Sequence, residues 1–470
     1  MKTPMADAAG QKQRGRARMR RDMDILNGPL ARNIFIFALP LALSSILQQF
    51  FNSADVAVVG NFADSLALAA VGVNAENVGI YINFVVGASV GPNVLAAKML
   101  GSKQDEKLSR AVHTTMALSI LIGLIVFVVG EMLAPPLLRW TEAPADVYPQ
   151  ALLYLRVFLV GLPFLTIFNF ATALMRSKGE TRLPLLYMVI SGVVNIVLNL
   201  GLVLAGKNPV LSVAVASVLA NVLSAGLSVA WLMRQTNALH FDPRKMVLEG
   251  PSVKEILVLG LPAGVQSMVF SISNVLVQAG INTFGVDVIA GSSVELNFEY
   301  FTYYFAIAFA QAAITFYAQN YAAGNKERCR RVLIVSMVEG VVVSQAVGWI
   351  FLIFNQPFLR FYTADPNVMH YAYQRLVLSQ SIEGVCAIFE IAAAIMRVRG
   401  WPITPSAIMI AGTVVFRMVW VFFIFPLHPT YEFLVLIYPV SWIVTDIAQL
   451  IALRLCLMRT QKPALGQARA

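Results

Sequence analysis

Charged residues, histidine and cysteine are scarce in this chain of 470 residues. Asp, Glu, Lys and Arg make up 13% of it, whereas hydrophobic residues make up 58%, and the mean hydropathy is +0.70. Soluble globular proteins carry about 25% charged residues. The shortage of charge therefore excludes an ordinary soluble domain and indicates a protein that lies in a membrane.

The four histidines do not form a catalytic or metal-binding pattern. They are scattered through loops or at the ends of apolar segments, at His113, His240, His370 and His428. An enzyme needs a nucleophile beside a base, and a zinc site needs clustered ligands. The chain also lacks the G-x-x-x-x-G-K-(S/T) loop that binds ATP phosphates. We therefore expect no intramembrane enzyme, no direct drive by ATP, and no metal or cofactor.

Long apolar runs fill most of the chain. About twelve of them reach the roughly 20 residues that an α-helix needs to cross a hydrocarbon core of ~30 Å. Helices are expected because lipid offers backbone groups no partners, and the short alternating segments of a β-barrel do not appear. The sequence thus predicts an all-α polytopic membrane protein. The expected spans are 34–59, 71–97, 113–137, 150–174, 184–205, 210–233, 255–281, 288–318, 332–354, 372–396, 403–427 and 432–457.

The basic residues alternate from one loop to the next. The two tails and every second loop hold 29 of the 35 Lys and Arg, whereas the opposite loops hold only Arg139, Lys207 and Arg360. Basic loops stay on the cytoplasmic side of a membrane, so we expect both termini in the cytoplasm. Topology and contact with anionic lipid head groups account for the net charge of +10 without a nucleic-acid partner.

One pattern occurs twice in the chain. Ala-x-Met-Arg-x-(Lys/Arg)-Gly, followed five residues later by Pro, runs over 173–184 and again over 394–405, which is 221 residues later. Leu39-Pro40 and Leu261-Pro262 form a second matching pair at the start of the first and seventh spans. An even number of spans separates the copies, so both halves have the same orientation. Such a parallel repeat is typical of transporters whose halves rock about a site between them.

The duplication defines the expected domains. The two halves are joined by a loop that contains Asp242-Pro243 and Gly250-Pro251. Each half is expected to be a six-helix lobe, and the two lobes are expected to enclose a central cavity. The predicted regions are a basic cytoplasmic tail over 1–33, an N-terminal lobe over 34–233, a cytoplasmic linker over 234–254, a C-terminal lobe over 255–457 and a cytoplasmic tail over 458–470.

Polar residues follow one face of the first span and a similar face of the seventh. In the first span they recur at helical spacing from Ser45 to Asp55. Single Ser and Asn residues often hold membrane helices together, but whole stripes on equivalent spans favour a hydrated cavity between the lobes. The candidates for lining it are Gln48, Gln49, Asn52, Asn274 and Gln278.

Acidic residues within the spans are the candidates for the mechanism. Asp55 ends the longest polar stripe and has no basic neighbour in the sequence. A carboxylate at mid-bilayer costs at least ~2.5–3.5 kcal/mol, so Asp55 is expected to carry a proton or bind a cation. The alternative is a residue that is hydrogen-bonded at a helix end near the outer interface. Glu295 and Glu299 on the eighth span, and Glu383 and Glu390 on the tenth, are further candidates.

Several short motifs carry a resemblance to a known family. They are Leu39-Pro40, Asn52 with Asp55 and Gly60, Ala69-Ala70-Val71-Gly72, Leu174-Met175-Arg176 with Gly179, Asn195-Ile196 with Leu198, and Gln319-Asn320 with Ala323-Gly324-Asn325. In this order and spacing the chain resembles the multidrug and toxic compound extrusion (MATE) family over roughly residues 30–457. The resemblance implies a twelve-helix antiporter that exports organic, usually cationic and lipophilic compounds in exchange for H⁺ or Na⁺.

The resemblance also assigns roles to individual residues. Asp55 falls on the first-helix aspartate that the family links to cation coupling, and Asn195 falls on the asparagine of its fifth-helix motif. Where many relatives carry an aspartate after Asn-Ile-x-Leu, this chain has Asn199, which removes one ionisable group and leaves the choice of ion open. The cation-coupling candidates are Asp55, Asn195, Asn199, Glu295, Glu299, Glu383 and Glu390.

We therefore expect a monomeric secondary active multidrug efflux antiporter in the cytoplasmic membrane. Its partners would be organic cations and the lipid bilayer. A flippase for a lipid-linked saccharide or a related lipid is the alternative function. It would need several cationic residues for a pyrophosphate, and only Arg156, Arg375 and Arg417 lie within the spans, where they could also neutralise acids.

Overall fold

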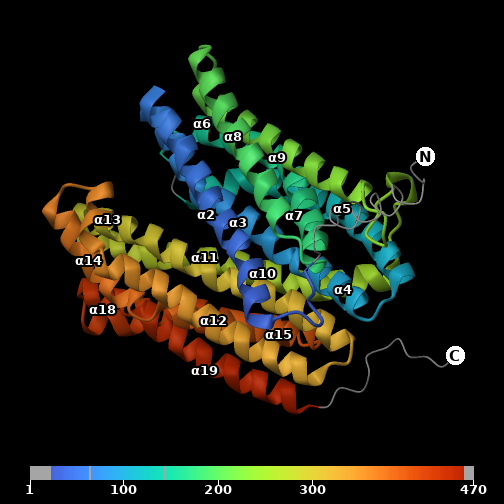
Figure 1. Cartoon of the computed structure of the whole chain (residues 1–470). Helices are drawn as coiled ribbons and strands as arrows, with labels where there is room; N and C mark the ends of the chain where they lie inside the picture. The colour runs from blue at the N-terminus through green and yellow to red at the C-terminus, as the bar shows by residue number, and fades with distance from the viewer. Residues whose placement is uncertain (1–22, 63–64, 142–143, 460–470) are drawn as a thin grey trace, which may run out of the picture.

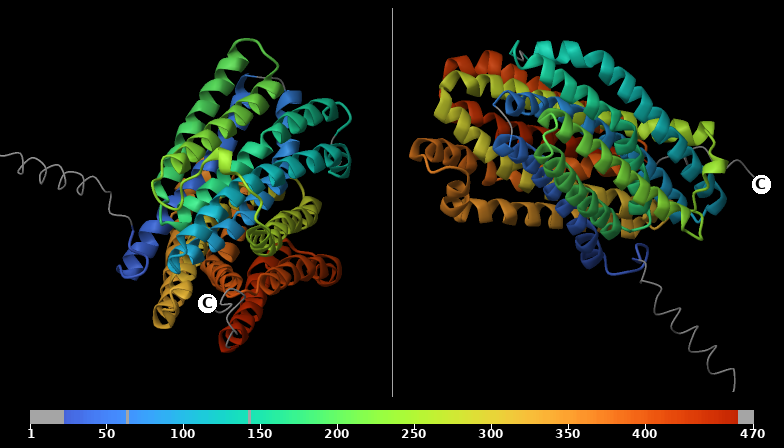
Figure 2. Two further views of the ribbon diagram at one scale, coloured as in Figure 1. Left: turned by 90° about the vertical axis from the view of Figure 1, so that its right-hand side faces the viewer. Right: turned by 90° about the horizontal axis from the view of Figure 1, so that it is seen from above.

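The protein is a bundle of helices that divides into two lobes. The computed structural model describes residues 23–62, 65–141 and 144–459, and these contain helices and no strands. The blue-to-green helices of the first half gather on one side and the yellow-to-red helices of the second half on the other (Figure 1), and the left view of Figure 2 keeps the same division. The all-α, two-lobe architecture expected from the sequence is confirmed. Most of each expected basic tail lies outside the described residues.

The described residues of the first half form eight helices. Leu30–Phe62 of α2 is continuous, although Pro40 lies inside it. The helices are α2 (Leu30–Phe62), α3 (Ser65–Ala88), α4 (Val90–Gly101), α5 (Asp105–Trp140), α6 (Tyr148–Val160), α7 (Leu162–Ser177), α8 (Arg182–Leu204) and α9 (Pro209–Met233). Because α3 with α4 and α6 with α7 each form one unit, these helices make six membrane-crossing units.

The second half repeats this order. The helices are α10 (Gly250–Ile281), α11 (Val286–Ala322), α12 (Lys326–Ile353), α13 (Asn355–Tyr362), α14 (Pro366–Gln380), α15 (Cys386–Val398), α16 (Ile403–Met409), α17 (Phe416–Val419), α18 (Tyr431–Val435) and α19 (Ile437–Met458). Two π-helical segments, Ile410–Val415 and Trp420–Ile424, flank α17, so that 403–427 forms one span.

The fourth unit of each half is broken, which the sequence did not predict. Ten described helices are long and apolar enough to cross a membrane, and α6 with α7, bent by 42° at Gly161, makes an eleventh. The corresponding unit in the second half is α14 and α15, separated by the turn Glu383–Val385. This unit contains buried charges and is interrupted, so its length and composition alone do not mark it as a span. Gln345 caps the break by donating to Gln380 O (2.8 Å) and accepting from Gly384 N (3.1 Å).

The repeated sequence motif ends a helix in each lobe. Gly179 follows α7 with φ +97°, and Gly400 follows α15 with φ +87°. Both positions lie in the left-handed region, which glycine enters at no steric cost. In each copy the residue after the glycine returns a backbone hydrogen bond to the methionine of the motif, Glu180 N to Met175 O (3.1 Å) and Trp401 N to Met396 O (2.9 Å). The motif is therefore a helix C-cap.

The lobes contact each other through two equivalent pairs of helices. Helix α2 of the first half packs against α11 of the second, and α10 of the second packs against α3 of the first. The seam between the lobes is narrow where the end of α3 meets α10. A Cβ atom at Gly87 would lie 2.6 Å from Ala263 O, so only glycine allows the helices to approach this closely.

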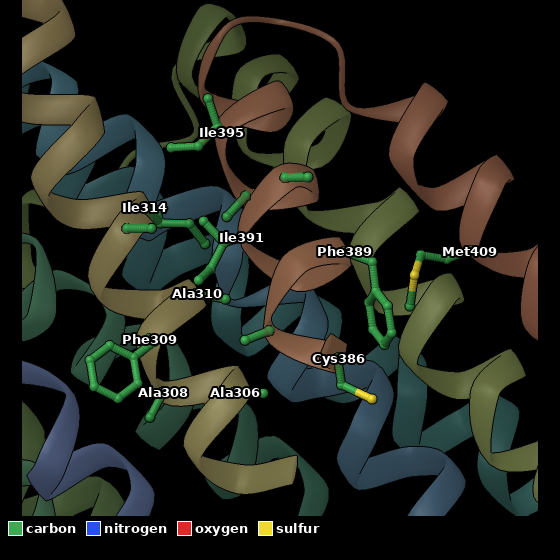
Figure 3. Close-up of a cluster of buried hydrophobic side chains, with 14 of the residues drawn as sticks. Ala306, Ala308, Phe309, Ala310, Ile314, Cys386, Phe389, Ile391, Ile395 and Met409 are labelled. Carbon is green, nitrogen blue, oxygen red and sulfur yellow. The ribbon is translucent and has the colours of Figure 1, made fainter. Parts of the chain in front are cut away.

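Small side chains also bring α11 and α15 together inside the second lobe. Ala306, Ala308 and Ala310 of α11 lie within the same buried cluster as Ile391 and Cys386 of α15 (Figure 3). Alanine lets two membrane helices approach closely, and close packing drives their association where there is no water to exclude. Helix α15 is thereby fixed with its other face toward the middle of the protein.

We expect Gly87→Ala to be destabilising because the added methyl group would collide with the backbone of α10 at Ala263. Overpacking of this kind costs about 1–3 kcal/mol. Fluorescence-detected gel filtration after heating would measure it as a lower midpoint of thermal denaturation. Gly72→Ala on the same helix is the control, since a Cβ atom there has no neighbour within 4 Å among the described residues. Equal midpoints for the two variants would contradict the importance of this contact.

Candidate functional site

A cavity of about 450 Å³ lies between the two lobes. Helices α2 and α3 of the first half and α10, α11 and α15 of the second contribute to its wall. Hydrogen bonds join the lobes across it, from Asn83 Nδ2 to Ser271 Oγ (2.8 Å) and from Tyr304 OH to Gln49 Oε1 (3.5 Å). The cavity therefore belongs to both halves of the repeat.

Asp55 forms the acidic site in the first lobe. It lines the cavity from α2 and is 8% exposed. Asn199 Nδ2 donates to Asp55 Oδ1 (2.9 Å), and Ser217 Oγ donates to Asp55 Oδ2 (3.4 Å). In the amide orientation that satisfies both of its polar atoms, Asn195 also donates to Asp55 Oδ1 (2.9 Å) and accepts from Ser217 N (3.2 Å). Three helices thus meet at one carboxylate.

The local sequence explains this convergence. Asn195 and Asn199 are four residues apart on α8, so their side chains leave the same face of the helix. That face packs against α2, and α9 supplies Ser217. The acidic candidates Glu295 and Glu299 of α11, and Glu383 in the turn before α15, lie in the other lobe and do not contact Asp55.

This group of side chains can exchange a proton or a small cation. It contains a single ionisable group, the Asp55 carboxylate, together with amide and hydroxyl oxygens, which are the ligands that hard cations prefer. Asn199 Oδ1 is buried and has no hydrogen-bond partner among the described residues, so it remains available as a further oxygen ligand. When Asp55 takes up H⁺ or Na⁺, the net negative charge on this wall of the cavity disappears.

Most of the polar residues expected in the cavity lie in its wall. Gln48, Gln49, Asn52 and Asn274 are among the lining residues. Gln278 is not among them. It lies one turn beyond Asn274, near the end of α10, where its Nε2 donates to Asn282 Oδ1 (2.9 Å). The polar stripe of α10 continues past the cavity.

Three of the acidic candidates are buried together inside the second lobe. Arg375 Nε lies 2.6 Å from Glu295 Oε2, and Arg375 Nη2 lies 2.7 Å from Glu299 Oε2. Ser379 Oγ also donates to Glu295. Glu383 is 1% exposed, and its Oε2 has no hydrogen-bond partner among the described residues. None of the three acids lines the cavity, and we infer a structural role for the pairing of Arg375 with Glu295 and Glu299.

The fourth acidic candidate lies in the cavity wall. Glu390 on α15 accepts a hydrogen bond from Tyr303 OH (2.7 Å), and both residues line the cavity. Arg397 lies two turns further along α15 and is also a lining residue. Arg397 was not predicted to belong to the site, although the repeated motif that contains it was the available signal.

We expect Arg375→Ala to destabilise the protein by about 3–5 kcal/mol, because it leaves buried carboxylates without their counterion. Arg156→Ala is the matched control, because Tyr154-x-Arg156 in the first half has the same pattern as Tyr373-x-Arg375 in the second. Arg156 is half exposed and lies 3.5 Å from Glu131, so its loss should cost about 1 kcal/mol or less. Thermal denaturation of the two variants in detergent would measure the difference. Similar losses for both would contradict the role assigned to the buried cluster.

A family model matches both halves of the chain. The model is MatE, and it matches residues 40–200 and 262–423. The two matched stretches begin at Pro40 and Pro262, which are the equivalent prolines of the internal repeat. The comparison therefore finds the same duplication as the repeated sequence motif and the two equivalent helix contacts between the lobes.

Two curated relatives and one solved structure are similar over most of the chain. The "probable multidrug resistance protein YoeA" of Bacillus subtilis (strain 168) is 24% identical over 81% of this chain and 83% of its own length. The "probable multidrug resistance protein NorM" of Thermotoga maritima is 24% identical over 72% and 74%. A MOP superfamily transporter from Pyrococcus furiosus has the same fold, with a TM-score of 0.84, 19% identity, and coverage of 93% of this chain and 98% of that one.

Proposed function

The chain belongs to the MatE family, and we propose that it is a secondary active multidrug efflux antiporter. It exports organic, mostly lipophilic and cationic compounds across the cytoplasmic membrane in exchange for H⁺ or Na⁺. It works as a monomer and without a cofactor. The observation that carries this proposal is the Asp55 carboxylate, which is buried by amides from α8 and opens onto a cavity between two duplicated lobes.

Exchange follows from competition at the cavity wall. When Asp55 is ionised, the wall of the first lobe is negative and attracts a cationic compound. Uptake of H⁺ or Na⁺ at Asp55 removes that charge and releases the compound. The concentration gradient of H⁺ or Na⁺ drives the cycle, and the membrane potential adds about 2.3 kcal/mol per 100 mV for each net positive charge that the cycle carries inward.

Aromatic side chains suit the lipophilic part of such a compound. Tyr300 and Tyr304 stack at a centroid distance of 6.3 Å, and Phe270 stacks on Tyr303 at 5.8 Å. All four residues line the cavity. Ring faces attract organic cations by about 0.5–2 kcal/mol, and they tolerate ligands of different shape because the attraction has little directional preference.

The distribution of basic residues supports termini that face the cytoplasm. Arg328 and Arg399 lie beside the described ends of the chain, since Arg328 donates to Ile25 O and Arg399 to Arg459 O. Arg139 lies in the last turn of α5. Under the positive-inside rule the side of the chain ends is cytoplasmic. The lobes therefore touch at the cytoplasmic end and diverge toward the outside (Figure 1).

A lipid-linked saccharide flippase is not favoured by the cavity. Such a substrate carries a pyrophosphate and needs several cationic contacts, and the cavity wall contains one arginine and no lysine.

We expect Asp55→Asn to abolish coupled export, since the amide can neither exchange a proton nor carry the charge that binds a cation. The test is transport of a fluorescent cation in vesicles under proton, sodium and electrical gradients imposed separately. Export by the variant should fall to the level of vesicles without the protein. Asp287→Asn, at an exposed residue at the start of α11, is the control. Normal export that still depends on pH or Na⁺, with intact expression of Asp55→Asn, would eliminate the assignment.

A further inference from the structure

A second pocket, of about 370 Å³, lies where the beginning of the described chain meets α12. The segment 28–30 forms one part of its wall, and Arg328, Arg331, Ile334 and Val335 of α12 form the other. Among these lining residues two are cationic, four are apolar or proline, and none is acidic. The pocket is therefore an apolar hollow with two guanidinium groups near the start of α12.

Arg328 holds the pocket together. Its Nε and Nη2 donate to Ile25 O (3.3 and 3.2 Å), and Nη2 also donates to Gly28 O (2.5 Å). Asn320 Nδ2 of α11 donates to the same oxygen of Ile25 (3.3 Å). Ile25 itself is 3% exposed, and its Cδ1 lies 3.3 Å from the place that a Cβ atom would take at Gly179. The segment before α2 is thus fixed against both lobes, so the pocket is formed before any ligand arrives.

The charge of Arg328 is only weakly compensated. Its partners are neutral carbonyl oxygens, and it has no ion pair within the part of the chain that the structure describes. Asp24 acts on it only from beyond ion-pair distance. Its Nη1 donates to none of the described residues and remains available to an anion.

Arg331 is the more exposed of the two arginines. It pairs with Glu327, four residues earlier on α12, at 3.1 Å, and the two side chains are 67% and 65% exposed. An exposed pair of this kind on a helix contributes about 0.3–0.5 kcal/mol. An incoming anion can therefore recruit Arg331 without breaking a strong interaction.

Apolar side chains continue from the pocket along the surface of the protein. Helix α12 and its neighbour α2 each expose three apolar residues at intervals of four, which places them on one face of each helix. These residues are Ile334, Val338 and Val342 on α12, and Phe35, Leu39 and Leu43 on α2. Both helices are long and apolar enough to cross a membrane. The two arginines therefore lie at the end of a lipid-facing surface, at the level where lipid head groups begin.

We propose that this pocket binds the phosphate of an anionic phospholipid whose acyl chains lie along the exposed faces of α2 and α12. Guanidinium groups form charge-assisted hydrogen bonds with phosphate, and basic pockets beside membrane helices recognise lipid head groups in this way. The N-terminal tail of the chain is a poorer occupant, because its run 14–21 contains five arginines. The inference goes beyond the proposed export function and is tested by binding alone, so either can fail without the other.

The test is native mass spectrometry of the purified full-length protein with dioctanoyl phosphatidylglycerol. Dioctanoyl phosphatidylcholine has the same chains, but its trimethylammonium group would face the arginines. We expect the wild-type protein to bind the first phosphatidylglycerol about tenfold or more tightly than phosphatidylcholine, and Arg331→Gln to lower the affinity for phosphatidylglycerol by about tenfold, since a charge-assisted hydrogen bond is lost. Equal affinities of the wild type for the two lipids would overturn the proposal.

Arg330→Gln is the matched control. Arg330 is the neighbouring residue and is also exposed, but it does not line the pocket, so its loss should leave the affinity for phosphatidylglycerol unchanged. Equal losses in the two variants would mean that the lipid is attracted by the basic surface in general, and the pocket would be wrong. Glycerol 3-phosphate has the phosphate without the acyl chains, and we expect it not to displace the lipid at equal concentration. Displacement would show that the pocket recognises a free phosphate, which also overturns the proposal.

If Arg331→Gln does not fold, photo-crosslinking of the wild-type protein decides. The probe is phosphatidylglycerol with a diazirine in one acyl chain, incorporated with the protein into phosphatidylcholine vesicles. We expect adducts in the peptides that cover 30–43 of α2 or 334–342 of α12, and we expect excess unlabelled phosphatidylglycerol to suppress them. Adducts confined to other helices, or adducts that the unlabelled lipid does not suppress, would contradict the proposal.

Discussion

The structure depends on the high cost of an uncompensated charge inside a membrane. Lipid supplies neither hydrogen bonds nor counterions, so each intramembrane charge must be paired within the protein or must face the space between the lobes. Glu295 and Glu299 are paired within the protein, with Arg375. Asp55 faces the space between the lobes, and neutral amides rather than a cation are its partners. Only the second arrangement leaves a charge that can change during transport.

The duplicated halves use equivalent positions for different purposes. A shift of 222 residues, which relates Pro40 to Pro262, also relates Asn52 to Asn274, and both of these asparagines line the cavity. By the same shift, the position equivalent to Asp55 in the second half is Val277. The scaffold is thus symmetric, whereas the charges are not: Asp55 and its amide partners lie in the first half, and the buried cluster around Arg375 lies in the second.

The sequence predicted whatever depends on local pattern. Apolar length and the repeated motif were enough for two lobes of six spans, and helical spacing placed Asn52 and Asn274 in the cavity. Pairing was not predictable, because Arg375 and Glu299 are 76 residues apart and meet only through the packing of α11 and α14. Spacing gives the face of a helix but not where a cavity ends along it, and Gln278 lies beyond the lining residues of α10.

The number of exchangeable charges limits how export is driven. The site at Asp55 contains one ionisable group, because Asn195, Asn199 and Ser217 are neutral. One H⁺ or Na⁺ exchanged for a compound with one positive charge moves no net charge, so the membrane potential does no work on that cycle. The exchange of one H⁺ or Na⁺ for a compound without net charge carries one positive charge inward, and the membrane potential then contributes about 2.3 kcal/mol per 100 mV. The charge of the compound therefore decides whether the membrane potential helps to drive its export.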